Sequence, residues 1–105
     1  MPDPKETVNE IGLAIIGCGT IGRIRAKFAR EYPGVKWLGL CDINGNVGRK
    51  LSEDVEADFF TADYEELLRR PEVNAAIIST DENEHVGPVL AAAEAGHDML
   101  IEKPL

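Results

Sequence analysis

The sequence predicts an α/β fold, in which helices cover both faces of an open sheet of parallel strands. Short apolar and β-branched runs alternate with segments of helical periodicity along most of the 105 residues. The connections between them are short, which is typical of right-handed crossovers between parallel strands. Hydrophobic residues make up 44% of the chain, enough for the core of one small domain. We therefore expect a doubly wound sheet of about five strands in the order 3-2-1-4-5.

The N-terminal part of the chain carries a clear strand pattern and a clear helix pattern. Residues 1–10 lack an apolar run and are expected to form a flexible tail, which leaves residues 11–105 as the domain. The continuous apolar run over 11–16 predicts a strand that is buried on both faces. Large apolar residues recur at helical spacing over 20–32, which predicts an amphipathic helix with these side chains as its apolar face. They are Ile21, Ile24, Phe28 and Tyr32.

The remaining elements continue the alternation. Further strands are expected over residues 35–41, 57–61, 74–80 and 97–102, and further helices over residues 46–55, 63–70 and 85–96. Asp63 is suited to cap the start of its helix, and Gly96 to close the last helix as its C′ residue. Pro88 falls in the first turn of that helix, where the missing N–H group costs little.

The acidic composition disfavours several classes of partner. The net charge is −8 and the pI is about 4.7, so the chain repels phosphate backbones and anionic lipid surfaces. We therefore expect no general binding to nucleic acid or membranes. No apolar run approaches the roughly 20 residues that span a bilayer, and the first residues do not resemble a signal peptide. A cytoplasmic protein without a metal site is expected, and any anionic ligand requires a local binding device.

The two cysteines, Cys18 and Cys41, do not form a disulfide framework by their number or spacing. Free or packed thiols are therefore expected, as in a reducing cytosol. Both cysteines are expected near the ends of neighbouring strands, so a bridge between them stays open as an alternative.

A glycine-rich loop follows the first expected strand. Gly17, Gly19 and Gly22 form a G-x-G-x-x-G motif between that strand and a helix, the context in which the motif predicts dinucleotide binding. Gly17 permits a tight turn, Gly19 leaves room for a diphosphate, and Gly22 lets the helix pack closely. The N–H groups at the helix start stabilise an anion, so Thr20 and Ile21 are also candidate cofactor-binding residues. The alternative is a plain turn.

Asp42 is the second marker of a dinucleotide site. It stands at the end of the second expected strand, about 20 residues after the glycine motif. A carboxylate there can accept hydrogen bonds from both hydroxyls of an adenosine ribose, and it repels a 2′-phosphate. We therefore predict NAD as the cofactor, with NADP less favoured. The alternative is an aspartate that only starts a turn or caps a helix.

From the fourth expected strand onward, the sequence AAIISTDENEHVGPVLAAAEAGHDMLIEKPL resembles the glucose–fructose oxidoreductase, inositol dehydrogenase and biliverdin reductase family. The matching features are the Thr80 loop, His85 at a helix start, AAAEAG over 91–96 and EKP over 102–104. With the glycine loop and DYEELLRRPEVNAAIIST, the resemblance covers about residues 11–105. It implies the Rossmann-type cofactor domain of an NAD(P)-dependent oxidoreductase acting on a sugar, cyclitol or related hydroxy compound.

The resemblance also implies roles for single residues. Lys103 would be the catalytic residue, beside the nicotinamide and hydrogen-bonded to the reacting substrate hydroxyl. Pro104 would follow a cis peptide bond that aims this lysine, and Glu102 would support the cofactor end of the strand. Thr80 and His85 are implied to bind the cofactor, and for His85 the alternative is a polar residue in the first turn of a helix.

Two features depart from the family pattern. Asp81 and Glu82 stand where family members usually carry Pro-Asn, and Glu84 follows close behind. These three carboxylates either weaken cofactor binding or accept hydrogen bonds from the cofactor. The sequence also stops one residue after EKP, before any substrate domain. We therefore expect this chain to bind the cofactor with little or no catalysis, and to self-associate or pair with a substrate domain. A non-catalytic nucleotide-sensing or interaction module is the alternative function.

Overall fold

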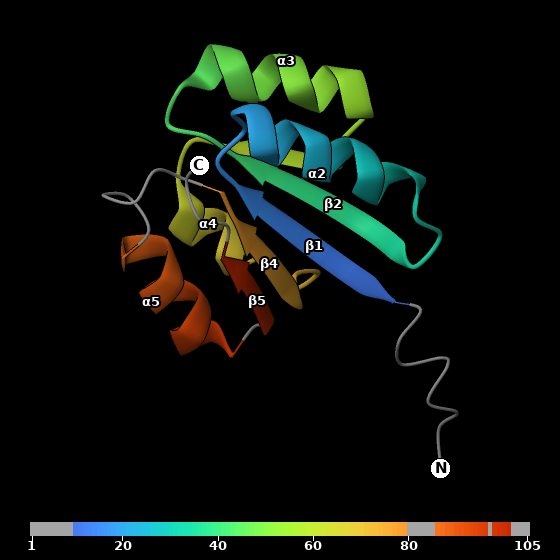
Figure 1. Ribbon diagram of the computed structural model, residues 1–105. Coiled ribbons are helices and arrows are strands. Elements are labelled where there is room, and N and C mark those ends of the chain that lie inside the picture. The colour runs from blue at the N-terminus through green and yellow to red at the C-terminus, as the bar shows by residue number, and fades with distance from the viewer. Residues whose placement is uncertain (1–9, 80–85, 97, 102–105) are drawn as a thin grey trace.

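The computed structural model describes residues 10–79, 86–96 and 98–101. Its strands form one sheet in the order β3-β2-β1-β4-β5 (Figure 1), and every neighbouring pair is parallel. The strands are β1 (Ile11–Ile16), β2 (Val35–Cys41), β3 (Phe59–Thr61), β4 (Ala75–Ile78) and β5 (Asp98–Ile101). The predicted fold class and strand order are confirmed.

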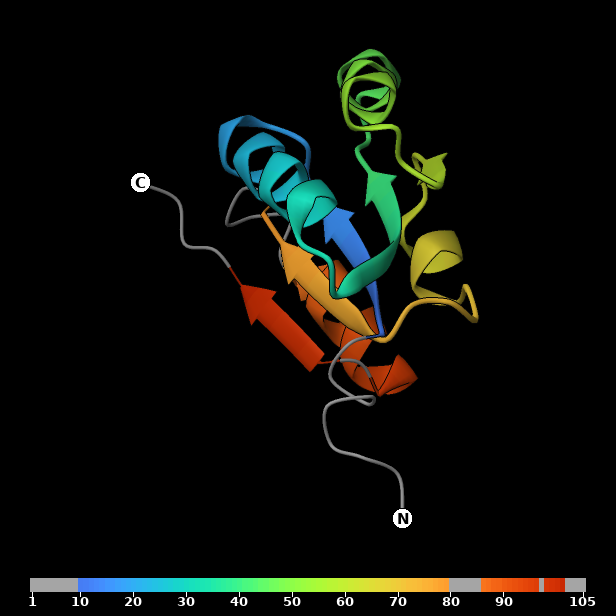
Figure 2. The same cartoon turned by 90° about the vertical axis from the view of Figure 1, so that its right-hand side faces the viewer.

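Helices cover both faces of the sheet (Figure 2). The helices α2 (Thr20–Glu31) and α3 (Gly45–Val55) lie on one face, and α4 (Tyr64–Leu68) and α5 (Val86–Ala95) lie on the other. This arrangement divides the core into two layers, with the sheet between them.

The central strand β1 contributes side chains to both layers, as its continuous apolar run predicts. Leu13 and Ile15 pack in the layer beneath α2 and α3. Ala14 and Ile16 point the opposite way and pack in the layer beneath α4 and α5. Successive residues of a strand face opposite sides of the sheet, so a strand covered on both sides needs apolar residues at every position.

The prediction for the buried face of α2 is wrong. The side chains of Ile24, Phe28 and Tyr32 are 55%, 74% and 49% exposed, and Ile21 is only half-buried. The buried face of the helix is instead formed by small residues, Gly22, Ala26 and Ala29. Without a Cβ atom at Gly22, the helix backbone lies close against the loop at its start, and this approach turns the small residues toward the sheet. Periodicity identifies an apolar stripe, but it does not say which side of the helix is buried.

Several local signals are confirmed. The Asp63 side chain accepts a hydrogen bond from the N–H group of Glu65 at the start of α4. Gly96, just after α5, has a φ of +76°, a conformation that glycine adopts without strain. Pro88 lies in the first turn of α5. Asn44 caps α3, which begins at Gly45, one residue earlier than expected.

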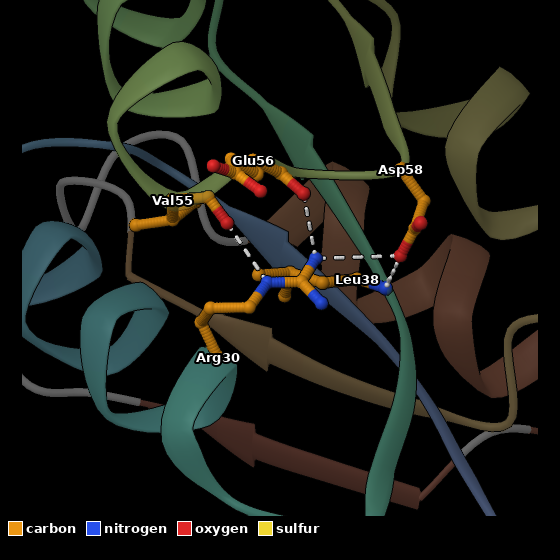
Figure 3. Close-up of polar contacts among 5 residues, drawn as sticks. All are labelled: Arg30, Leu38, Val55, Glu56 and Asp58. Carbon is orange, nitrogen blue, oxygen red and sulfur yellow. Dashed lines mark hydrogen bonds and ion pairs between the residues drawn. The ribbon is translucent and has the colours of Figure 1, made fainter.

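Arg30 connects α2 to the end of α3 (Figure 3). Its Nε donates to the carbonyl oxygen of Val55 at 2.8 Å, and its Nη2 donates to that of Glu56 at 2.9 Å. Both carbonyl groups lie at the C-terminus of a helix, where the last C=O groups have no intrahelical hydrogen-bond donor. Nη2 also lies 3.4 Å from Oδ2 of Asp58, which accepts the N–H group of Leu38 at 2.8 Å. Arg30 and Asp58 thus join α2, α3 and β2 on one face of the sheet.

Candidate functional site

A pocket of about 550 Å³ opens where the carboxyl ends of β1, β2 and β4 meet. In an open α/β sheet this edge, at the point where the strand order reverses, is the usual ligand site. The pocket combines the glycine loop with residues that follow β2 and β4 and with the first turns of α4 and α5. Its lining residues are Ile16, Gly17, Gly19, Cys41, Asp42, Ile43, Tyr64, Ser79, Gly87 and Pro88.

The three glycines of the loop differ in what surrounds them. Gly17 has a φ of +99°, a left-handed conformation that favours glycine, and its N–H group donates to the carbonyl oxygen of Cys41 at 2.8 Å. At Gly22, an added Cβ atom would stand 1.8 Å from the carbonyl oxygen of Gly17. At Gly19, an added Cβ atom would meet no atom of the described residues within 4 Å. The turn and the helix packing therefore require Gly17 and Gly22, whereas the fold leaves open space at Gly19.

The start of α2 is open to an anionic ligand. Gly19 occupies the N-cap position, where no side chain of the described residues accepts a hydrogen bond from the first turn. The first turn of a helix has N–H groups without intrahelical partners, and it carries the positive end of the helix dipole. Thr20 and Ile21 belong to this turn and follow Gly19, which lines the pocket. The start of a helix is a common binding site for anions in proteins.

Asp42 lies half-buried at the end of β2. Its Oδ2 accepts the N–H group of Cys18 at 2.8 Å, and its Oδ1 accepts the N–H group of Asn44 at 2.8 Å. The carboxylate therefore ties the glycine loop to β2 and starts the turn that leads into α3, which is the alternative role that the sequence leaves open. An ionised carboxylate has about four acceptor positions, so both oxygens retain capacity for a ligand.

The other sequence-predicted site residues lie outside the described residues. They are Thr80, His85, Glu102 and Lys103, together with the expected cis bond before Pro104. The described strands that precede them, β4 and β5, are parallel neighbours in register from Ala75↔Asp98 to Ile78↔Ile101. The two strands therefore end side by side at the same edge of the sheet.

Sequence reasoning missed two polar residues that line the pocket, Tyr64 and Ser79. Tyr64 begins α4, and its hydroxyl lies 2.3 Å from the position that a Cβ atom on Gly87 would occupy. The absence of a side chain at Gly87 thus lets the first turns of α4 and α5 meet beside the pocket. No local sequence pattern predicts the contact between the first turns of α4 and α5, because the two helices belong to different crossovers. Ser79 follows β4 directly, and the only available signal was its place at a strand end.

The two cysteines are free, and both are buried beside Asp42. The Sγ of Cys18 lies 3.5 Å from the carbonyl oxygen of Cys41, to which it donates. Burial is the main cause that raises the pKa of both thiols to about 12, and the charge of Asp42 adds to it. The structure therefore shows packed thiols and no bridge.

We predict that these thiols do not react in the folded protein. A disulfide reagent at about pH 8 should label neither quickly, and should label both Cys18 and Cys41 after unfolding in guanidinium. The pKa of both thiols is about 12 in the folded protein, whereas the pKa of an unperturbed thiol is 9.0. The unfolded state therefore binds fewer protons between these values, and the free energy of unfolding should fall as the pH rises through this window. Rapid labelling of the native protein would contradict this prediction.

No helix within the described ranges is long and apolar enough to cross a membrane.

Comparison with known proteins gives a match along almost the whole chain. A family model described as "Oxidoreductase family, NAD-binding Rossmann fold" matches residues 11–105. The chain is 32% identical over 97 residues to inositol 2-dehydrogenase of Agrobacterium fabrum, covering 90% of this chain and 29% of that protein. It is 32% identical over 95 residues to 2,7-anhydro-N-acetylneuraminate hydratase of Mediterraneibacter gnavus, covering 90% of this chain and 25% of that protein. The chain thus spans between a quarter and a third of the length of these relatives.

Solved structures agree with the sequence comparison. The crystal structure of GenD2 from gentamicin A biosynthesis, in complex with NAD, superposes with a TM-score of 0.85 at 27% identity. That match covers 100% of this chain and 30% of GenD2. A mutant of a 3-ketoreductase from Actinomadura kijaniata, in complex with TDP-benzene and NADP, gives a TM-score of 0.77 at 25% identity. This second match covers 90% of this chain and 30% of the ketoreductase.

Proposed function

The chain belongs to the oxidoreductase family with an NAD-binding Rossmann fold, and from this we propose that it binds the cofactor of a sugar, cyclitol or related hydroxy-compound dehydrogenase. In this proposal the NAD diphosphate lies over the glycine loop, and the adenosine ribose lies at the end of β2. The relatives are about three to four times longer, so the substrate and the complete reaction are proposed for a protein that includes a substrate domain.

The observation that carries the proposal is the open start of α2 within a strongly acidic chain. The net charge of −8 repels anions in general, yet the pocket brings uncapped N–H groups and open space together at Gly19. A diphosphate fits this combination because backbone donors and the helix dipole act on it at short range, where the distant carboxylates are screened.

Asp42 is the residue that we propose to select NAD over NADP. Its carboxylate lines the pocket at the end of β2 and keeps free acceptor capacity on both oxygens. Two ribose hydroxyls can donate to such a group, whereas a 2′-phosphate would stand against its negative charge. The exposed side chain of Ile43, next in the chain, also lines the pocket and offers an apolar surface for the adenine ring.

We propose that Lys103 assists the proton transfer, as the family resemblance implies. Oxidation of a CH–OH group releases a hydride from carbon and a proton from oxygen, and the bound nicotinamide supplies the hydride chemistry. A lysine hydrogen-bonded to the reacting hydroxyl would hold or receive that proton, and an apolar, partly desolvated setting would favour its neutral form. Thr80, His85 and Glu102 are proposed as further cofactor-binding residues.

Titration calorimetry tests the binding proposal directly. The 105-residue chain should bind NAD with a measurable heat, and NADP more weakly. Absence of NAD binding at millimolar ligand would contradict the proposed function. Equal binding of the two cofactors would contradict only the proposed role of Asp42.

The substitution Asp42→Ala should weaken NAD binding about ten- to a hundredfold, because charge-assisted hydrogen bonds to the ribose are lost. NADP should lose less affinity, since the repulsion of its 2′-phosphate disappears at the same time. The matched control is Glu53→Ala, which removes one negative charge from an exposed position on α3. Calorimetry with both cofactors measures the change, and an unaltered ratio of the two affinities would place the ribose contact elsewhere.

A further inference from the structure

Ser79 carries a buried hydroxyl that the described residues do not satisfy. Its Oγ is shielded from solvent and lacks a hydrogen-bond partner in that part of the chain. Its backbone is well held, because its N–H group donates to the carbonyl oxygen of Ile16 at 2.8 Å. Leaving a hydroxyl buried and unpaired costs free energy, so such a group calls for an explanation.

One other side-chain atom in the described ranges is buried without a hydrogen-bond partner, and it has a local explanation. This atom is Nε of Arg70. The guanidinium carbon of Arg70 lies 4.7 Å from the ring centroid of Phe59 and 5.8 Å from that of Trp37, so the aromatic faces compensate part of the cost. No comparable group is described next to the Ser79 hydroxyl.

The position of Ser79 points to a ligand. The residue lines the same pocket as Gly17 and Gly19. Its Cβ atom lies 3.7 Å from the position that a Cβ atom on Gly22 would occupy, so Ser79 packs against the first turn of α2. Ser79 thus lies between the end of β4 and the helix start that the proposed function assigns to a diphosphate.

We propose that the Ser79 hydroxyl donates a hydrogen bond to the diphosphate of the bound dinucleotide. This assignment rests on the proposed function and adds a side-chain donor to a site otherwise formed by backbone N–H groups. A serine side chain has three staggered χ1 rotamers, so its hydroxyl can be redirected by rotation about one bond. In this proposal the ligand supplies the hydrogen-bond partner that the described residues do not give this hydroxyl.

The substitution Ser79→Ala tests the assignment through two effects of opposite sign. Alanine removes the unpaired oxygen, so the unliganded variant should unfold at a higher denaturant concentration than the parent chain. The same variant should bind NAD about tenfold more weakly, because one charge-assisted hydrogen bond is lost. A residue with a purely structural role would not lower the affinity while raising the stability.

The controls separate the possible failures. Ser52→Ala removes the other serine hydroxyl of the chain, on α3 outside the pocket, and should leave NAD affinity unchanged. ADP contains the diphosphate but no nicotinamide ribose, so Ser79→Ala should weaken ADP and NAD alike. The assignment would be overturned if Ser79→Ala weakened the binding of NAD but not of ADP, or if parent and variant bound NAD equally. Neither result would contradict the proposed function. If the parent chain bound neither nucleotide, both proposals would fail.

Discussion

Replacing Gly19 with valine is expected to abolish NAD binding while leaving the fold intact. Within the described part of the chain, a Cβ atom at this position meets nothing within 4 Å, and the φ of −72° is one that any L-residue adopts. The valine side chain would fill the space over the start of α2, where the proposed diphosphate lies. Because the N–H groups of the helix could then no longer approach the phosphate oxygens, we expect affinity to fall by at least about a hundredfold.

The matched control for this experiment is Gly45→Val. Gly45 is also a glycine at a helix start, and no atom in the described ranges lies within 4 Å of an added Cβ there, but it does not line the pocket. Calorimetry should detect NAD binding to the parent chain and the Gly45 variant only, and circular dichroism should give folded spectra for all three. NAD affinity of the Gly19 variant equal to that of the parent would remove the main support for the proposed site.

Replacing Gly22 with alanine should, in contrast to the Gly19 substitution, cause a large loss of stability. The added Cβ atom would stand 1.8 Å from the carbonyl oxygen of Gly17 and 2.8 Å from its carbonyl carbon. Both are backbone atoms, so no side-chain rotation relieves the clash, and α2 must move away from the loop. Overpacking of a tight contact costs about 1–3 kcal/mol and sometimes more, and we expect about 3 kcal/mol or above here. That is a large part of the 5–15 kcal/mol typical of a small domain.

Urea denaturation followed by circular dichroism measures this effect. Ala26 lies one turn later on the same buried face of α2 and provides a milder substitution for comparison. Ala26→Gly creates no clash and should lower the free energy of unfolding by only about 1 kcal/mol. A Gly22→Ala variant as stable as the parent would show that the loop and the helix can separate at little cost. Substitutions at two glycines of one motif are thus expected to have different effects: at Gly19 they impair ligand binding, and at Gly22 they impair folding.

Local sequence patterns predicted the architecture well wherever interactions between residues close in the sequence determine the structure. The ends of β1 and β2 follow from apolar runs that stop at Gly17 and Asp42. The cap at Asp63 and the left-handed residue at Gly96 follow from side-chain and backbone chemistry within a few residues. Strand order follows from the alternation of elements and the handedness of their connections.

The rotation of α2 and the composition of the site depended on tertiary structure. The sequence offers both a large apolar stripe and a small-residue stripe on α2, and close packing at Gly22 turns the small one inward. The two contacts of the Asp42 carboxylate join the loop after β1 to the turn after β2, segments that meet only in the folded sheet.

The sequence by itself thus determined the class of fold, the order of its strands and the glycine loop, because each depends on neighbours along the chain or on a general rule of chain connection. Only the tertiary structure brought Ser79 and Tyr64 to the pocket and left the Ser79 hydroxyl without a partner among the described residues. Such contacts join residues from different crossovers, and their geometry depends on how closely the helices pack on the sheet. That distance is set by the whole core and not by any local pattern.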